Sequence, residues 1–243
     1  GAQDERSQTL RFHAQTAGSS LTAQQPDNNV VRVTLQALAA VCGGAQSLHT
    51  NARDEALALP TEQSAKLALR TQQILAYESG AAAAADPLGG SWYVEHLTGQ
   101  LEAEALHYMD KVRNLGGMLA AIESGYVQAE IQEAAYQHQK SLESGSEAVV
   151  GVNCFREDSH SPIEILRIEP ELEMEQVRRL EEMRLRRDSE KVDALLASIR
   201  QAAAGTENLL PHLIDAVEAL ATVGEISNAL RQVFGEHRET VAI

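Results

Sequence analysis

The spacing of apolar residues near the N-terminus constrains the fold of this chain more than any other feature, because it changes from a strand pattern to a helix pattern and back. Residues 8–15 alternate between apolar and polar side chains, which predicts a strand, and residues 45–50 are interpreted as a second strand. Between them, apolar side chains recur every three or four residues, as in a helix, at Val31, Leu35, Leu38 and Cys42. A strand, a helix and a strand in this order predict a crossover connection and therefore parallel strands.

Capping residues and glycines predict where the helices begin and end. Asp27 or Asn28, in a turn at residues 25–28, can cap the first helix, and Thr61 is the expected cap of the next one. A residue without a Cβ commonly follows the last helical turn. Helices are therefore expected to end at Gly43–Gly44, Gly80, Gly116–Gly117, Gly125 and Gly145.

The rest of the chain reads as helix with short extended connections. Extended segments or brief strands are predicted at Trp92–Val94, Val149–Val152 and Ile163–Leu166. Residues 171–204 are rich in Glu and Arg and are interpreted as a solvated helix. Their arginines could meet an acidic partner or phosphates instead, but the interleaved glutamates disfavour that reading. The predicted fold class is α/β and predominantly helical.

Composition excludes several classes of protein. Aromatic residues make up only 4% of the 243 residues, so the core must consist of Leu, Ala, Val and Ile, which suits packed helices. The formal net charge of −15 opposes binding to nucleic acid or to an anionic membrane surface. Cys42 and Cys154 lack the spacing of metal ligands, so no metal site is expected.

The N-terminus carries no targeting signal that we can identify. No apolar window approaches the ~18 residues of a membrane span, and no signal-peptide pattern is present, so a cytoplasmic or matrix protein is expected. The chain opens on Gly1 and its first methionine is Met109, so a processed, engineered or incomplete N-terminus has to be considered.

Both predicted strands carry polar side chains where parallel strands are usually apolar. Buried polar groups are costly unless they find partners, so such a cluster suggests a ligand cavity at the carboxyl ends of barrel strands. An exposed edge strand would explain the same pattern, and the two readings are about equally supported. The polar residues are Arg11, His13 and Gln15 in the first strand, and Gln46, Ser47, His49, Thr50 and Asn51 at the second.

Several of these residues lie in stretches that resemble the methylmalonyl-CoA mutase large-subunit family. The resemblance covers nearly the whole chain, with one departure at Ala45. It is carried by Leu10–Asn29, Gln46–Asn51, Asp54–Pro60, Asp86–Ser91, Gly116–Met118, Gly151–Asn153 and Thr222–Ile226.

The resemblance implies a specific fold. In the family a (β/α)8 TIM-type barrel encloses the acyl-CoA along its axis, and adenosylcobalamin lies across the barrel mouth. Residues 1–115 are similar to the C-terminal part of that barrel, with its last two parallel strands and their helices. Residues 116–243 correspond to a helical post-barrel segment. The remaining N-terminal barrel half would have to come from elsewhere, so the chain alone is expected to be inactive.

The resemblance also implies roles for individual residues. The catalytic pair is expected to be His13 and Gln15. The substrate-binding residues implied are Arg11, Phe12, His13, Gln46 and Ser47. The cofactor-binding residues implied are Gln15, Gly18, Asn51, Glu55 and Ala58. His13 and Gln15 are expected to orient groups by hydrogen bonding, without ligating a metal.

The implied activity is that of an isomerase which rearranges the carbon skeleton of an acyl-CoA by radical chemistry, converting (R)-methylmalonyl-CoA to succinyl-CoA. Alternatives are an isobutyryl-CoA or 2-hydroxyisobutyryl-CoA mutase large subunit, or a non-catalytic fragment retained as an interaction module. The family's Asp-x-His-x-x-Gly cobalt-ligand motif is absent. A cobalamin-binding small subunit or domain is therefore an expected partner, in a hetero-oligomer or dimer.

Overall fold

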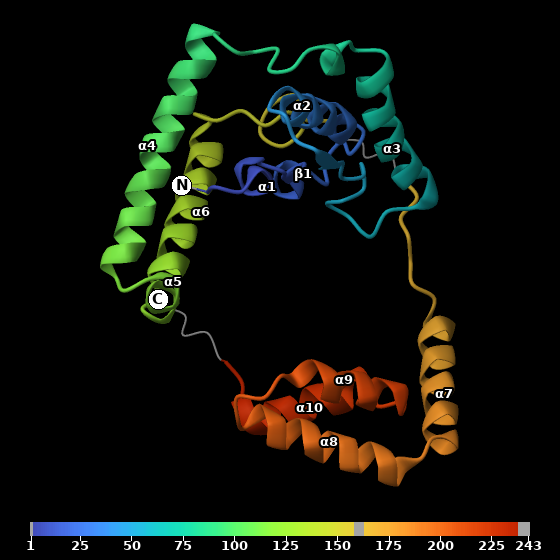
Figure 1. Ribbon diagram of the computed structural model, residues 1–243. Helices are drawn as coiled ribbons and strands as arrows, with labels where there is room; N and C mark the ends of the chain where they lie inside the picture. Colours follow the sequence, from blue (N-terminus) through green and yellow to red (C-terminus); the bar gives the residue numbers. More distant parts are fainter. Residues whose placement is uncertain (1, 158–162, 238–243) are drawn as a thin grey trace. The chain divides into compact units, whose positions relative to one another are not determined.

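The computed structural model describes residues 2–157 and 163–237. It divides into two compact units, Gly1–Arg167 and Ile168–Thr240, which are described separately (Figure 1). The first contains a small parallel sheet with helices, and the second is entirely helical in its described part. The predicted boundary between the barrel part (residues 1–115) and the post-barrel segment (residues 116–243) refers to the complete barrel and stays a prediction.

The predicted strand–helix–strand unit is present, with shorter strands than expected. Strand β1 (His13–Gln15) and strand β2 (Ser47–His49) are connected by helix α2 (Asn28–Cys42). The strands are parallel and pair residue for residue, His13 with Ser47 through Gln15 with His49. Of the predicted first strand, Gln8 is instead the last residue of a helical turn, α1 (Glu5–Gln8), capped by Asp4, and residues 9–12 form no regular element.

Helix α2 buries a different face from the one its large apolar residues predicted. Val31 and Leu35 are 61% and 62% exposed, whereas Asn29, Val33 and Ala37 are buried. Small side chains let the helix axis approach the strands and helix α3 closely, so the core selects Val33 and Ala37 over larger neighbours. The prediction from apolar spacing was therefore right about the helix and wrong about its buried face.

Helix α3 (Glu62–Tyr77) is fastened to the end of β2 by polar side chains. The Thr61 hydroxyl accepts the Ser64 N–H at 3.2 Å, which confirms the predicted cap. The buried Thr50 hydroxyl donates to the Ala68 carbonyl at 2.8 Å, and Gln72 Nε2 donates to the Leu48 carbonyl at 3.1 Å. One face of the strand pair is thereby covered by helices.

Three helices follow α3, after a connection that contains the short 3-10 turn η2 (Ala81–Ala83). They are α4 (Trp92–Asn114), α5 (Met118–Glu123) and α6 (Tyr126–Ser144), and they end next to the glycines that predicted their ends. The extended stretch predicted at Trp92–Val94 is wrong, because α4 begins at Trp92. The Glu95 carboxylate accepts the Gly90 N–H at 2.8 Å, which stabilises that first turn.

The segment after α6 returns to the beginning of the chain. Arg32 Nη2 donates to the Val150 carbonyl at 2.8 Å, and Gln25 Nε2 donates to the Phe155 carbonyl at 3.0 Å. Val150 and Cys154 form one isolated bridge, so the strand considered at Val149–Val152 is a turn, and Ile163–Leu166 forms no strand.

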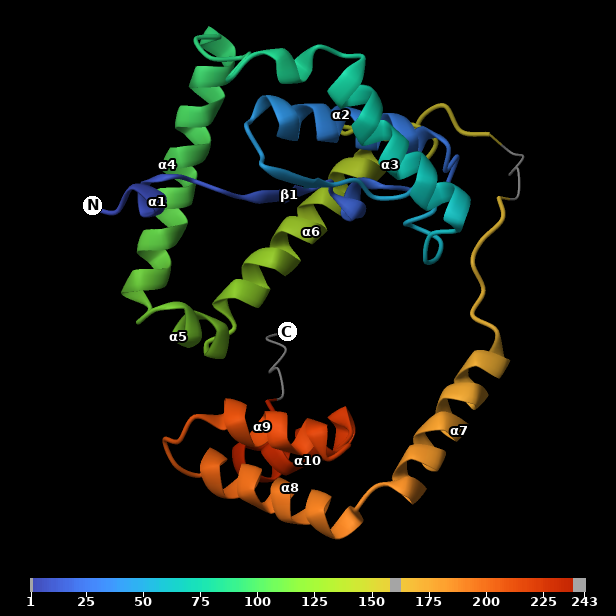
Figure 2. The same ribbon diagram turned by 45° about the vertical axis from the view of Figure 1, so that its right-hand side comes forward.

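The second unit contains α7 (Pro170–Arg186), α8 (Ser189–Ala203), α9 (Leu209–Glu218) and α10 (Val223–Phe234) (Figure 2). The single solvated helix predicted for residues 171–204 is wrong, because it breaks at Arg187 and Asp188. Only α7 is solvated, whereas α8 contributes to a core that α9 and α10 complete. This core is formed by Val192, Leu196, Ile199, Ala216 and Ala229. None of the described helices is long and apolar enough to cross a bilayer.

An ion pair fastens the start of α10 to the break before α8. The Arg187 side chain is 8% exposed and donates to both carboxylate oxygens of Glu225, at 2.7 and 2.5 Å. Glu225 also accepts the Thr222 N–H at 2.8 Å and completes a capping box. The hydrogen bonds from Arg187 lower the pKa of the Glu225 carboxyl to about 2, well below its ordinary value.

We predict that acid weakens the second unit through Glu225. Because the pKa of Glu225 is lower in the folded chain than in the unfolded chain, its contribution is complete above about pH 4.5 and is lost as the pH falls toward about 2. Chemical unfolding of the chain between pH 6 and 2.5 measures this loss. Glu225→Gln should lower stability at neutral pH by about 2 kcal/mol and flatten the acid dependence. An unchanged acid slope in Glu225→Gln would contradict the assignment.

Candidate functional site

The uncovered face of the strand pair is polar. Side chains alternate along a strand, so residues two apart share a face, and the pairing register places two such residues from each strand side by side. His13 Nδ1 lies 2.9 Å from Ser47 Oγ across the strands. Next to them, Gln46 Oε1 accepts the Phe12 N–H at 2.7 Å. The exposed face is formed by His13, Gln15, Ser47 and His49.

Two buried polar side chains join the carboxyl ends of the strands. The Thr16 hydroxyl donates to Asn51 Oδ1 at 2.7 Å and accepts the Asn51 N–H at 2.9 Å. Both residues are nearly inaccessible, at 5% and 3% exposure. Hydrogen bonds between buried groups are strong because water cannot replace them. The loops that follow β1 and β2 therefore start from a fixed separation.

Gly18, Asn51 and Glu55 lie together just beyond this junction and are called the cradle below. A Cβ on Gly18 would lie 3.0 Å from Asn51 Nδ2 and 3.4 Å from Glu55 Oε1, so these two side chains approach residue 18 this closely only because it is glycine. The Asn51 amide is largely buried, and Glu55 is exposed and carries a carboxylate. An amide and a carboxylate can hydrogen-bond hydroxyl groups such as those of a ribose, so the chemistry of these residues fits adenosylcobalamin.

The structure thus brings together most of the residues that were predicted as site residues, in two adjacent groups. His13, Gln46 and Ser47 belong to the polar strand face, whereas Gly18, Asn51 and Glu55 form the cradle. The remaining predicted residues lie at the margins of these groups. Arg11 and Phe12 are exposed, whereas Gln15 lies on the strand face with His13. Ala58 is half-buried in the loop after β2, where its N–H donates to the Asp54 carbonyl at 3.0 Å.

Two fully buried polar residues of the site were not predicted from the sequence. Asn29 has 0% exposure and bonds to the loops after both strands. Asp54 also has 0% exposure, and its Oδ2 accepts the Thr61 N–H at 3.1 Å. A polar residue in the first turn of a helix usually reads as a solvated position or a cap, so nothing in the spacing distinguished Asn29 from Asn28.

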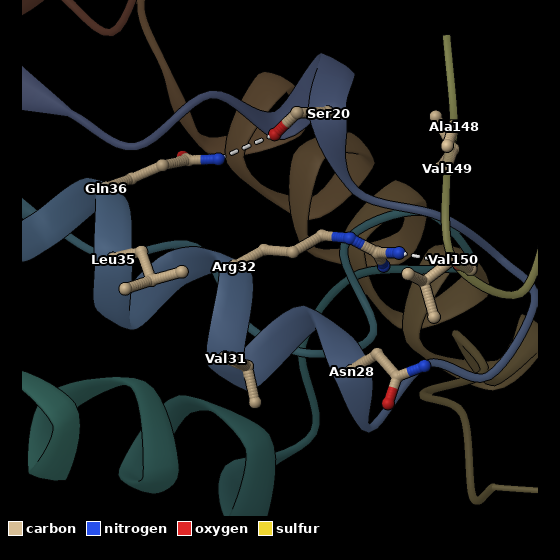
Figure 3. A pocket seen from close by; sticks show the side chains of 9 residues that line it. All are labelled: Ser20, Asn28, Val31, Arg32, Leu35, Gln36, Ala148, Val149 and Val150. Carbon is tan, nitrogen blue, oxygen red and sulfur yellow. Dashed lines mark hydrogen bonds between the residues drawn. The ribbon is translucent and has the colours of Figure 1, made fainter.

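A separate pocket of about 560 Å³ lies on the other side of α2 (Figure 3). Its wall is mostly apolar, with Arg32 and Gln36 as its main polar side chains. None of the predicted site residues lines it. The pocket is lined by Ser20, Asn28, Val31, Arg32, Leu35, Gln36, Ala148, Val149 and Val150. In the described part of the chain, no group of three or more His, Cys, Asp or Glu side chains is placed to hold a metal ion.

Comparison with known proteins identifies close relatives. The sequence profile of the methylmalonyl-CoA mutase family matches residues 1–236. The chain is 46% identical over 230 residues to the methylmalonyl-CoA mutase of Rhizobium meliloti, and 43% identical over 235 residues to the mitochondrial methylmalonyl-CoA mutase of Homo sapiens. It is also 46% identical over 242 residues to the 2-hydroxyisobutanoyl-CoA mutase large subunit of Aquincola tertiaricarbonis.

These matches cover nearly all of this chain but only a part of each relative. The covered share of this chain is 94%, 96% and 99% for the three proteins, in the order given. The covered share of the relatives is 32%, 31% and 43%. The chain therefore spans about a third of the length of two of these relatives and about two fifths of the third.

We predict that the Thr16 hydroxyl is required to hold the two loops together. Thr16→Val keeps the shape of the side chain but removes the hydroxyl that bonds to the side-chain Oδ1 and the backbone N–H of Asn51. This loss should destabilise the chain by about 1–3 kcal/mol. Thr16→Ser keeps the hydroxyl and should cost less than about 1 kcal/mol. Denaturant unfolding of the three proteins compares them. A Thr16→Val protein as stable as the unsubstituted one, or one that loses less than Thr16→Ser, would show that the methyl group matters and the hydrogen bonds do not.

Proposed function

The chain belongs to the methylmalonyl-CoA mutase family, and we propose that it forms part of the active site of an adenosylcobalamin-dependent acyl-CoA mutase. The single observation that carries this proposal is the exposed polar face of two parallel strands beside a glycine cradle at their carboxyl ends. In a parallel barrel, catalytic residues lie at the carboxyl ends of strands. A filled barrel interior would be apolar, so a polar inner face fits a barrel that encloses a ligand.

In this proposal β1, α2, β2 and α3 are the last two strand–helix units of a (β/α)8 barrel. Helices cover one face of the strand pair, as they do on the outside of such a barrel. The face that carries His13 and Ser47 would then point to the barrel axis. The remaining strands would pair with the free edges of β1 and β2, and would close the channel around the acyl-CoA.

The strand face would bind and orient the acyl-CoA. His13 is held by its 2.9 Å contact with Ser47, so its other ring nitrogen, Nε2, is free to donate to or accept from a substrate oxygen. A positioned donor at the thioester carbonyl stabilises charge there without reorganisation. Gln46 is fixed by its bond to the Phe12 backbone and would, with Ser47, Arg11 and Phe12, line the path of the CoA arm.

The cradle would hold the cofactor. Gly18 would allow close approach of the corrin ring, while Gln15 and Ala58 would line the same surface and Asn51 and Glu55 would hydrogen-bond the adenosyl group. When bound, adenosylcobalamin supplies the radical chemistry of the reaction. The protein's share is to position the substrate and exclude water, and His13 and Gln15 do so by hydrogen bonding. A cobalamin-binding domain or small subunit would supply the cobalt ligand.

Two substrate classes remain in competition. The Rhizobium meliloti relative is named for methylmalonyl-CoA and the Aquincola tertiaricarbonis relative for 2-hydroxyisobutanoyl-CoA, and this chain is 46% identical to each. We propose the conversion of (R)-methylmalonyl-CoA to succinyl-CoA, because two of the three relatives compared above carry that name. A large subunit that accepts 2-hydroxyisobutyryl-CoA or isobutyryl-CoA is the second candidate.

The proposal predicts activity in the complete protein. With a cobalamin-binding partner and adenosylcobalamin, it should isomerise methylmalonyl-CoA faster than isobutyryl-CoA or 2-hydroxyisobutyryl-CoA, as measured by chromatography of the CoA esters. His13→Ala should lower kcat/KM about 100-fold, because it removes a positioned hydrogen-bonding group. His138→Ala, at an exposed position on α6, is the matched control and should stay within about twofold of the unsubstituted protein. Turnover of none of the three esters would refute the proposal.

The cradle yields a prediction about cofactor affinity. Gly18→Ala adds a Cβ that would lie 3.0 Å from Asn51 Nδ2, so it should displace Asn51 and weaken adenosylcobalamin binding about tenfold or more. Gly99→Ala is the control, because a Cβ at Gly99 meets no atom within 4 Å. Absorbance titration of the complete protein with the cofactor gives both affinities. Equal affinities would place the cofactor away from Gly18.

A further inference from the structure

The Asn29 side chain is the most completely bonded polar group in the site. It is fully buried, and its amide nitrogen donates to the Thr22 carbonyl at 2.9 Å and to the Arg53 carbonyl at 3.0 Å. Its amide oxygen accepts the Thr22 N–H at 3.1 Å and Arg32 Nη1 at 2.8 Å. A primary amide has two donors and two acceptor positions, so every one of them is used.

These bonds join two loops that are far apart in the sequence. Thr22 lies in the loop after β1 and Arg53 in the loop after β2. The first loop carries Gly18, and the second carries Asn51 and Glu55. The separation of the two halves of the cradle therefore depends on the Asn29 amide, in addition to the Thr16–Asn51 junction at the strand ends and the ion pair of Arg53 with Asp27 at 2.7 Å.

Two further side chains of α2 hold the first loop against the helix. Gln36 accepts the Ala17 N–H at 2.7 Å and donates to the Ser20 hydroxyl at 2.7 Å. Figure 3 shows Gln36 reaching Ser20, and Arg32 reaching the carbonyl of Val150. Arg32 also donates to the Thr22 hydroxyl at 3.0 Å. Asn29, Arg32 and Gln36 thus all bind the first loop to α2. Of these three side chains, Asn29 alone also bonds to the second loop, at the Arg53 carbonyl.

We propose that Asn29 is a positioning residue that couples the loops after β1 and β2 and so sets the width of the cofactor cradle. This inference rests on the proposed function, because it assigns the cradle to adenosylcobalamin. Asn29 acts through Thr22 and Arg53 and does not itself touch the cofactor, since it is fully buried behind them.

The test uses Asn29→Asp in the complete protein. Aspartate has the same size as asparagine but replaces the amide donors with an oxygen, which would repel the Thr22 and Arg53 carbonyls and leave the bond from Arg32 intact. Asn28→Asp is the matched control, because among the described residues the Asn28 amide bonds only to Gln25 nearby, at 2.8 Å. Asn29→Ser, which introduces no charge, serves as a second variant in case the aspartate prevents folding.

Three quantities are measured: the Kd of adenosylcobalamin, the Kd of the acyl-CoA without cofactor, and amide hydrogen exchange in the two loops. Asn29→Asp should raise the cofactor Kd about tenfold, change the acyl-CoA Kd by less than about twofold, and speed exchange in residues 17–27 and 51–58 together. Asn28→Asp should leave all three quantities close to those of the unsubstituted protein.

Three results would overturn the inference: an unchanged cofactor Kd, an equal loss of acyl-CoA affinity, or faster exchange in residues 17–27 alone. The second would show a general structural role, and the third would show that the loops are independent. If the unsubstituted protein binds no adenosylcobalamin, the proposed function fails and the cofactor-positioning role fails with it. The exchange experiment then still decides by itself whether Asn29 couples the loops.

Discussion

The parallel pairing of β1 with β2 is the interaction on which the rest of the site depends. Parallel strands bring their carboxyl ends to one edge, so the loops that leave them begin side by side. The buried contact between Thr16 and Asn51 fixes that edge, and the Asn29 amide extends the connection to the loops themselves. With one strand face covered by helices, the other is left to present His13 and Ser47.

Much of the fold could be predicted from local signals in the sequence. The spacing of apolar residues, which changes from a strand pattern to a helix pattern and back, predicted the crossover, and glycines predicted the helix ends. The buried face of α2 could not be predicted, because packing close to the strands favours Ala37 over larger residues such as Leu35. The break at Arg187 was missed although Asp188, a residue type that favours helix N-caps, follows it directly and accepts the Lys191 N–H at the start of α8.

The candidate site was predictable to a different degree. Polar residues on the strands indicated a cavity, but an exposed edge explained the pattern equally well, and the family resemblance supplied the individual roles. Asn29 and Asp54 were missed because a buried polar residue in a loop or a first helical turn looks like a solvated one. Only the three-dimensional structure shows that their partners lie in other segments of the chain.

The most direct test of this account is an experimental structure of the complete protein with adenosylcobalamin and a non-reactive acyl-CoA. The account predicts that further parallel strands flank β1 and β2, that the acyl-CoA thioester lies against His13 and Ser47, and that the corrin lies over Gly18. An acyl-CoA bound away from this strand face would contradict the account. So would a complete protein in which the His13 and Ser47 face is packed against helices or is exposed to bulk solvent.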